Sequence, residues 1–246
     1  MPEKYRLAEM DWMEVEKRLR SDTRVVIPLG ATEEHGYLSL LTDTLFVDYV
    51  TERACARTGV LVGPVLPFGC SAFAINFPGT ISLRTATMCR VIEDIVDSLY
   101  RQGFRRMAFV TGHGGNEVIT GALEEAQFDR CQLNIYYKNA WAGMKESVRQ
   151  IEKELGFAKG EHASWHEEFW FTRIGAIPSR QKEFPESADF PTFPINPRTA
   201  RMHLEDGVVG GRYTLEDDAR MGKLLEMCVD ALADFLSALP RTPADE

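Results

Sequence analysis

The chain has 246 residues, 44% of them hydrophobic, and its 37 acidic against 28 basic side chains give a formal net charge of −9. Because phosphate contacts need clustered cations, this acidic balance excludes nucleic acid as an expected partner. The length and apolar content predict a single domain over residues 1–246 that folds without disulfides. The N-terminus lacks a signal-peptide pattern and no apolar run approaches the ~20 residues of a membrane span, so we expect a soluble, cytoplasmic protein with no membrane partner.

Short β-rich runs alternate with helical patterns along the chain. The strand candidates are, in chain order, 25–29, 60–67, 107–111 and 133–137, and the helical patterns are 44–57, 85–102, 118–128 and 215–239. Prolines in 60–67 place that strand at a sheet edge or strand end. Asn116 stands where a helix N-cap belongs, just before the third helical pattern. This alternation predicts an α/β fold, a layered α/β/α domain with a largely parallel sheet that binds ligands at the carboxyl ends of its strands.

The stretch 180–201 departs from this pattern. It contains four prolines and three phenylalanines within 22 residues and shows no regular period. We interpret it as a long ordered loop, either a lid over a site or a contact with a neighbouring subunit.

Histidines and carboxylates gather first in the loop after the first predicted strand. Glu33 and His35 are two residues apart, a spacing that in extended chain points both side chains to one side. Asp43 follows just before a helix. This mixed set of nitrogen and oxygen donors suits zinc, manganese or iron.

Two further segments carry the same residue types. His113 lies in a Thr-Gly-His-Gly-Gly-Asn turn after the third predicted strand, where glycines allow close approach of backbone to a ligand. The alternative is a tight turn in which His113 is incidental; a nucleotide-phosphate loop is excluded because no Gly-Lys-Ser/Thr follows. The segment 161–168 adds two histidines and three carboxylates, and its alternative interpretation is a solvated helix start.

Taken together, these segments resemble the creatininase superfamily of metal-dependent amidohydrolases. Residues 28–43 read PLGATEEHGYLSLLTD, against a family pattern of roughly PxGSxEQHGPHLPxxTD. Residues 77–83 match the family's FPGTxSL segment, and residues 112–116 match its GHGGN turn. Residues 162–167 echo HAGxxE and residues 207–210 match GVxG. The matches follow the family order across most of the chain.

The resemblance implies a centre of one or two divalent metal ions (Zn, Mn, Mg or Fe) that activates a water as the nucleophile. Glu33, Asp43 and His113 would surround one metal. His35, Asp43 and Glu167 would surround a second, with Asp43 bridging. The resemblance also implies a homo-oligomer, hexameric or smaller.

Catalytic and substrate roles are implied in the same way. His162 would be the proton shuttle, for which its ordinary pKa of ~6.5 is suited. Glu161 matches a position associated with substrate binding and proton transfer. The predicted substrate contacts are Tyr37, Phe73, Asn116 and Trp165.

The sequence departs from the family pattern on the side expected to face the substrate. Between Gly36 and Asp43 it is one residue shorter, and Tyr37 replaces part of the segment that holds a second histidine. Many members carry a Glu-His pair before the FPGT segment, and here Phe73 and Ala74 replace it. Gly115 stands where creatininase has a glutamate, so we predict either that Glu167 supplies that carboxylate or that the second metal is bound weakly.

These features predict hydrolysis of a small cyclic polar substrate, in the simplest case the opening of a cyclic amide. An alternative within the superfamily is C–C cleavage of a cyclic diketone such as 3-dehydro-scyllo-inosose. A third hypothesis is a metal- or ligand-binding protein that has lost catalysis.

Overall fold

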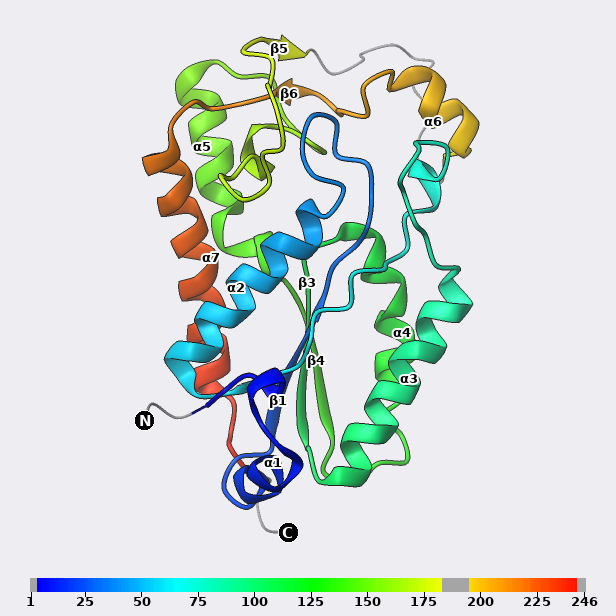
Figure 1. The fold of residues 1–246 in the computed structure, drawn as a ribbon, viewed down its shortest axis with the longest axis vertical. Coiled ribbons are helices and arrows are strands. Elements are labelled where there is room, and N and C mark those ends of the chain that lie inside the picture. The colour runs from blue at the N-terminus through cyan, green and yellow to red at the C-terminus, as the bar shows by residue number, and fades with distance from the viewer. Residues whose placement is uncertain (1–3, 183–194, 243–246) are drawn as a thin grey trace.

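Four parallel strands form the centre of the computed structural model, which describes residues 4–182 and 195–242 (Figure 1). The strands are β1 (Arg24–Leu29), β2 (Leu61–Val62), β3 (Arg106–Thr111) and β4 (Asn134–Asn139), arranged in the order β2-β1-β3-β4. β1 and β3 pair along their whole length, as do β3 and β4. The predicted strand 60–67 shrinks to the two residues of β2 and lies at the sheet edge, as its prolines predict.

Helices cover both faces of this sheet, which confirms the predicted α/β/α fold (Figure 1). One face packs against helices α2 (Thr42–Thr58), α5 (Lys145–Leu155) and α7 (Asp218–Ala238). The other packs against α1 (Trp12–Leu19), α3 (Thr85–Gln102) and α4 (Thr120–Glu125). Strand residues alternate between the two cores, with Val26 in the first and Val25 in the second, because successive side chains point to opposite faces.

The helix predictions are accurate for the long helices α2, α3 and α7. The pattern 85–102 coincides with α3, and α2 and α7 lie within a few residues of their predicted bounds. The predicted helix 118–128 is present but shorter: α4 begins only after a 3-10 helix, η3 (Gly114–Ile119), and ends at Glu125. Asn116 lies inside η3 and its amide bonds to the backbone of other loops, so it caps no helix.

The remaining elements are short, and they lie in the loops and connections between the main helices and strands. They are the antiparallel pair β5 (Gln181–Lys182) and β6 (Gly211–Arg212), helix α6 (Pro197–His203), and the 3-10 helices η1 (Leu7–Glu9), η2 (Ala72–Ala74), η4 (Ala140–Met144) and η5 (Trp165–Glu167). Of the stretch 180–201, residues 183–194 lie outside the described part, and its remaining C-terminal portion forms most of α6. Within the described ranges, no helix has both the length and the apolar character needed to cross a membrane.

The connections create a switch point between β1 and β3. β1 continues through α2 to β2 on one side, whereas β3 continues through α4 to β4 on the other. In open parallel sheets the crevice beyond such a point, at the carboxyl ends of the strands, is where ligands bind. The loops that follow β1 and β3 carry the predicted donors.

Candidate metal centre

The loop between β1 and α2 places three buried donors. Glu33, His35 and Asp43 are each at most 3% exposed. Asp43 lies in the first turn of α2, where the helix dipole favours a carboxylate. The helix is fixed to the strand end by the Thr44 hydroxyl, which donates to the Ala31 carbonyl at 2.8 Å.

The turn after β3 supplies His113. The Thr111 hydroxyl donates to the His113 carbonyl at 2.8 Å and stabilises the turn from inside. A Cβ on Gly115 would lie 2.0 Å from the Cys70 carbonyl oxygen and 2.5 Å from His113 Nε2, so only glycine fits this position. The glycine-rich sequence therefore lets the neighbouring loop pack directly against the histidine.

His162 arrives from a more distant segment. An antiparallel bridge between His162 and Val209 fixes its backbone. The next residue, Ala163, has φ +55°, and its N–H donates to the Glu167 carboxylate at 2.6 Å. The Glu167 side chain thus holds the turn that directs His162 toward the loop after β1.

The first group of donors is Glu33, Asp43 and His113. One potential ligand atom from each lies within 4.8 Å of the other two. His113 Nδ1 is 2.8 Å from Asp43 Oδ2 and 3.6 Å from Glu33 Oε2. This is the set expected around one metal.

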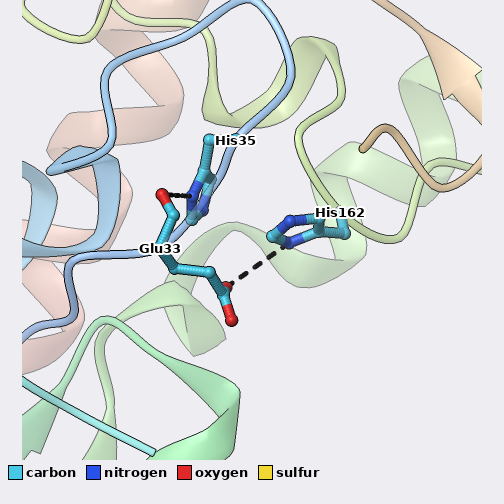
Figure 2. A group of neighbouring side chains, drawn as sticks. All are labelled: Glu33, His35 and His162. Carbon is cyan, nitrogen blue, oxygen red and sulfur yellow. Dashed lines mark hydrogen bonds and ion pairs between the residues drawn. The ribbon is translucent and has the colours of Figure 1, made fainter. Parts of the chain in front are cut away.

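The second group is Glu33, His35 and His162, whose potential ligand atoms also lie within 4.8 Å of one another (Figure 2). His162 Nδ1 is 4.0 Å from Glu33 Oε2, and the rings of His35 and His162 have centroids 4.5 Å apart. Asp43 touches both groups, because its Oδ1 is 3.2 Å from His35 Nε2. Asp43 therefore lies between the two groups, Glu33 belongs to both, and the bridging role of Asp43 stays a prediction.

Two buried oxygens indicate that these donors suit a cation. Glu33 Oε1 and Asp43 Oδ2 have no hydrogen bond of acceptable geometry. Asp43 Oδ2 has a partner, His113 Nδ1 at 2.8 Å, only as an ion pair while that ring is protonated. Buried carboxylate oxygens without partners are costly, and a divalent cation between them removes that cost. Nitrogen and carboxylate donors are ligands that zinc and manganese accept.

The ring nitrogens outside the cluster orient two of the histidines. His35 Nδ1 lies 3.1 Å from the Glu33 carbonyl oxygen, and His113 Nε2 lies 3.2 Å from the Cys70 carbonyl oxygen. A carbonyl only accepts, so each of these nitrogens carries the proton. In the neutral ring the nitrogen that faces the carboxylates is left with its lone pair, as a metal ligand requires.

Without a metal, protons occupy the positions between the donors. Burial lowers the pKa of His35, but the charge and hydrogen bonding of Asp43, together with the charges of Glu167 and Glu33, outweigh it and raise that pKa to about 10. The pKa of His113 is raised to about 9, because the charges of Glu33 and Asp43 outweigh burial in the same way. The pKa of His162 also rises to about 9 in spite of its burial. Burial raises the pKa of Asp43, but the two neighbouring imidazoliums reverse this and lower it.

Metal binding near neutral pH should therefore release protons. Histidines with a pKa of about 9 to 10 are protonated at pH 7 and must lose that proton to ligate. Apparent affinity should rise with pH until it passes these values, because proton competition then ends. Titration calorimetry of Zn²⁺ or Mn²⁺ binding in two buffers of different ionisation enthalpy measures the release. A heat that is independent of the buffer would contradict this prediction.

Two predicted site residues, Glu167 and Glu161, lie outside both donor groups. Glu167 is buried, but among the described residues it joins neither donor group, and its carboxylate is engaged by the Ala163 N–H. Glu161 is exposed and pairs with Lys159. It points away from the centre because it is adjacent to His162 in an extended, bridged segment, where neighbours face opposite sides.

The four predicted substrate contacts differ in how they lie relative to the centre. Phe73 lies beside the centre, with its ring edge-on to His162 at 5.7 Å between centroids. Tyr37 packs edge-on against Tyr213. Trp165 and Asn116 are fully buried: Trp165 belongs to the main core, and the Asn116 amide donates to the Gly30 carbonyl. The structure does not bring these two to the centre as accessible groups.

Sequence reasoning missed Glu34. Its side chain is buried, and its Oε1 lies 3.0 Å from His162 Nε2. In the pattern used for the resemblance, this position is glutamine between the glutamate and histidine ligands. The unusual Glu-Glu-His in this chain is the signal that could have found it.

A centre of buried histidines and carboxylates at the switch point of a parallel sheet defines a metal-binding α/β protein of the metallohydrolase class. The profile of the creatininase family (creatinine amidohydrolase) matches residues 8–236. The chain belongs to the creatininase family. The matched residues span most of the chain, and the single domain stays a prediction.

Its relatives are hydrolases. The chain is 29% identical to creatinine amidohydrolase of Pseudomonas putida over 94% of this chain and 95% of that protein. It is 36% identical to the mycofactocin precursor peptide peptidase of Mycobacterium tuberculosis (strain CDC 1551 / Oshkosh), over 42% of this chain and 43% of that one. It is 26% identical to the 3-dehydro-scyllo-inosose hydrolase of Thermotoga maritima, over 47% of this chain and 38% of that one. The chain is thus a metal-dependent hydrolase.

Solved structures agree with the fold. A mutant creatininase described as Zn-Zn type superposes with a TM-score of 0.78 at 26% identity, covering 95% of this chain and 97% of that one. A structure described as creatininase Mn gives a TM-score of 0.80 at 24% identity, with coverage of 95% and 97%. The family and the two donor groups of this chain together assign one or two divalent ions to the centre.

Proposed function

We propose that the chain opens a small cyclic amide by metal-dependent hydrolysis. The observation that carries this proposal is the pair of buried oxygens on Glu33 and Asp43 that lack a hydrogen bond, among three histidines at the carboxyl edge of the sheet. The full-length similarity to a creatinine amidohydrolase supports the amide class.

The centre supplies the chemistry through its ligands. A divalent metal bound there would lower the pKa of a water molecule from ~15.7 towards ~7 and polarise a carbonyl oxygen. Glu33, Asp43 and His113 would hold it, and the carbonyls of Glu33 and Cys70 keep His35 and His113 in the right orientation. Burial of these side chains keeps the electrostatic interactions of the site strong.

Phe73 would form one wall of the substrate site. Its ring stands against His162 and packs on a small apolar cluster of Ala74, Phe77 and Leu204. An apolar wall beside the metal suits a compact ring better than a charged group. The predicted roles of Trp165 and Asn116 in substrate binding, and that of Glu161 in catalysis, stay predictions that their positions do not favour. The role of Tyr37 in substrate binding also stays a prediction.

The C–C hydrolase of a cyclic diketone is the second candidate. It rests on the similarity to the Thermotoga maritima inosose hydrolase, which covers less than half of either chain. The same donors could bind two neighbouring oxygens of an oxidised ring. The homo-oligomer and the cytoplasmic location stay predictions from the sequence.

A panel of substrates tests the proposal. Zinc- and manganese-loaded protein is incubated with creatinine and other five- and six-membered cyclic amides, a short linear peptide, and an inosose diketone, and products are followed by mass spectrometry. We expect ring opening of at least one cyclic amide, which His162→Ala abolishes and His203→Ala leaves intact. Turnover of the diketone alone would favour the second candidate. Binding of cyclic ligands without conversion would support the non-catalytic hypothesis.

A further inference from the structure

His162 presents one ring nitrogen to the centre and the other to Glu34. Its Nε2 lies 3.0 Å from the Glu34 carboxylate and 3.0 Å from the Glu34 carbonyl oxygen. Both of these groups only accept, so Nε2 carries the proton. In the neutral ring Nδ1 then has a free lone pair, and Nδ1 is the nitrogen that faces Glu33 (Figure 2).

Glu34 is held firmly behind this ring. Its carboxylate also accepts from the Gly36 N–H at 3.2 Å, and its own N–H donates to the Thr80 hydroxyl at 3.0 Å. Gly207, with φ +80°, packs so closely that a Cβ there would lie 1.8 Å from Glu34 Oε2. A buried carboxylate that fixes the outer nitrogen of a histidine is the usual support of a metal-ligating imidazole.

Two other sources for a ligand of this metal are disfavoured by the structure. Gly115 has no side chain, and the Cys70 carbonyl oxygen lies where a Cβ would stand. The Glu167 carboxylate joins neither donor group, although its charge acts on His35, and its Oε2 accepts the Ala163 N–H of the turn after His162. Within the described residues, His162 is the side chain that completes a donor group with Glu33 and His35.

We infer that His162 is a nitrogen ligand of a second divalent metal, together with His35 and Glu33, and that Glu34 is the residue that positions its ring. This replaces the predicted proton-shuttle role of His162 and the predicted ligand role of Glu167. The inference rests on the proposed metal-dependent function, but it concerns metal binding alone and does not depend on which substrate is hydrolysed.

Cobalt binding tests this assignment. Metal-free protein is titrated with Co²⁺, and bound metal is measured by elemental analysis together with the visible absorption of the cobalt. We expect two Co²⁺ per wild-type chain, and only the first in His162→Ala. Glu34→Gln keeps a hydrogen-bond acceptor near the ring but loses the charge, so it should weaken the second site by roughly 10- to 100-fold. His203→Ala and the exposed Glu117→Gln are the controls, and both should bind as the wild type does.

The outcomes separate the two roles of His162. If His162→Ala and Glu34→Gln both bind two Co²⁺ with wild-type affinity and spectrum, the inference is wrong. Loss of turnover with metal content intact would then return His162 to proton transfer. Circular dichroism shows whether His162→Ala is folded. If it is not, the Co²⁺ affinity of the second site in Glu34→Gln tests the inference. Failure of the substrate panel, with the second Co²⁺ lost from the variants as expected, would overturn the proposed function only.

Discussion

Asp43→Asn should empty the metal centre. Asp43 Oδ1 is 3.2 Å from His35 and Oδ2 is 2.8 Å from His113, so this carboxylate belongs to both halves of the site. The amide has the same shape but no anionic oxygen to balance a cation. Loss of an outer partner of a metal ligand already costs ~10- to 100-fold in affinity, so loss of this shared ligand should cost more than ~100-fold. Competition with a fluorescent chelator measures it.

Asp48→Asn is the matched control, since Asp48 lies on the same helix and outside both donor groups. It should bind metal with wild-type affinity. An Asp43→Asn protein that also binds as tightly as the wild type would show that the cation is held elsewhere.

Gly115→Ala should damage the fold and the centre together. The added methyl would lie 2.0 Å from the Cys70 carbonyl oxygen and 2.5 Å from His113 Nε2, and neither neighbour is a flexible side-chain end. Overpacking of this kind costs about 1–3 kcal/mol. For a chain of this size that corresponds to a fall in Tm of roughly 2–12 °C. Because His113 must move, metal affinity should fall as well.

Gly114→Ala offers a control one residue away. A Cβ on Gly114 meets nothing within 4 Å, so the same substitution should change stability by no more than about 0.5 kcal/mol. Thermal unfolding of the two variants, each with and without zinc, measures the difference. Equal melting temperatures for the two would contradict the packing described for this turn.

The sheet and its main helices could be predicted from the sequence because each carries a simple period. α3 buries four residues on one face and exposes the opposite face, which fixes its bounds. The short elements could not be predicted in this way. α4 begins after a 3-10 turn because Asn116 ties together the loops that follow β1 and precede η2, and these contacts depend on residues 86 and 46 positions away.

The centre could be predicted in part. Glu33, His35, Asp43 and His113 follow two neighbouring strand ends, so sequence and sheet order together place them side by side. The contact between His162 and Glu34 spans 128 residues, and nothing local indicates it.

Two of the three carboxylates in the 161–168 segment, Glu161 and Glu167, show what local sequence can and cannot decide. Glu161 and His162 point to opposite sides, because they are adjacent residues in an extended segment. By sequence alone, Glu167 is a candidate for the missing carboxylate. In the structure its carboxylate accepts the Ala163 N–H, and this hydrogen bond depends on a turn that the sequence does not reveal.

Metal content per wild-type chain is the most direct test of this protein as a metal-dependent hydrolase. Protein purified without a histidine tag, as isolated and after incubation with zinc or manganese, is measured by elemental analysis. We expect one to two divalent ions per chain, held by the buried donors around Glu33 and Asp43. A chain that is isolated without metal and stays empty after both incubations would contradict the account.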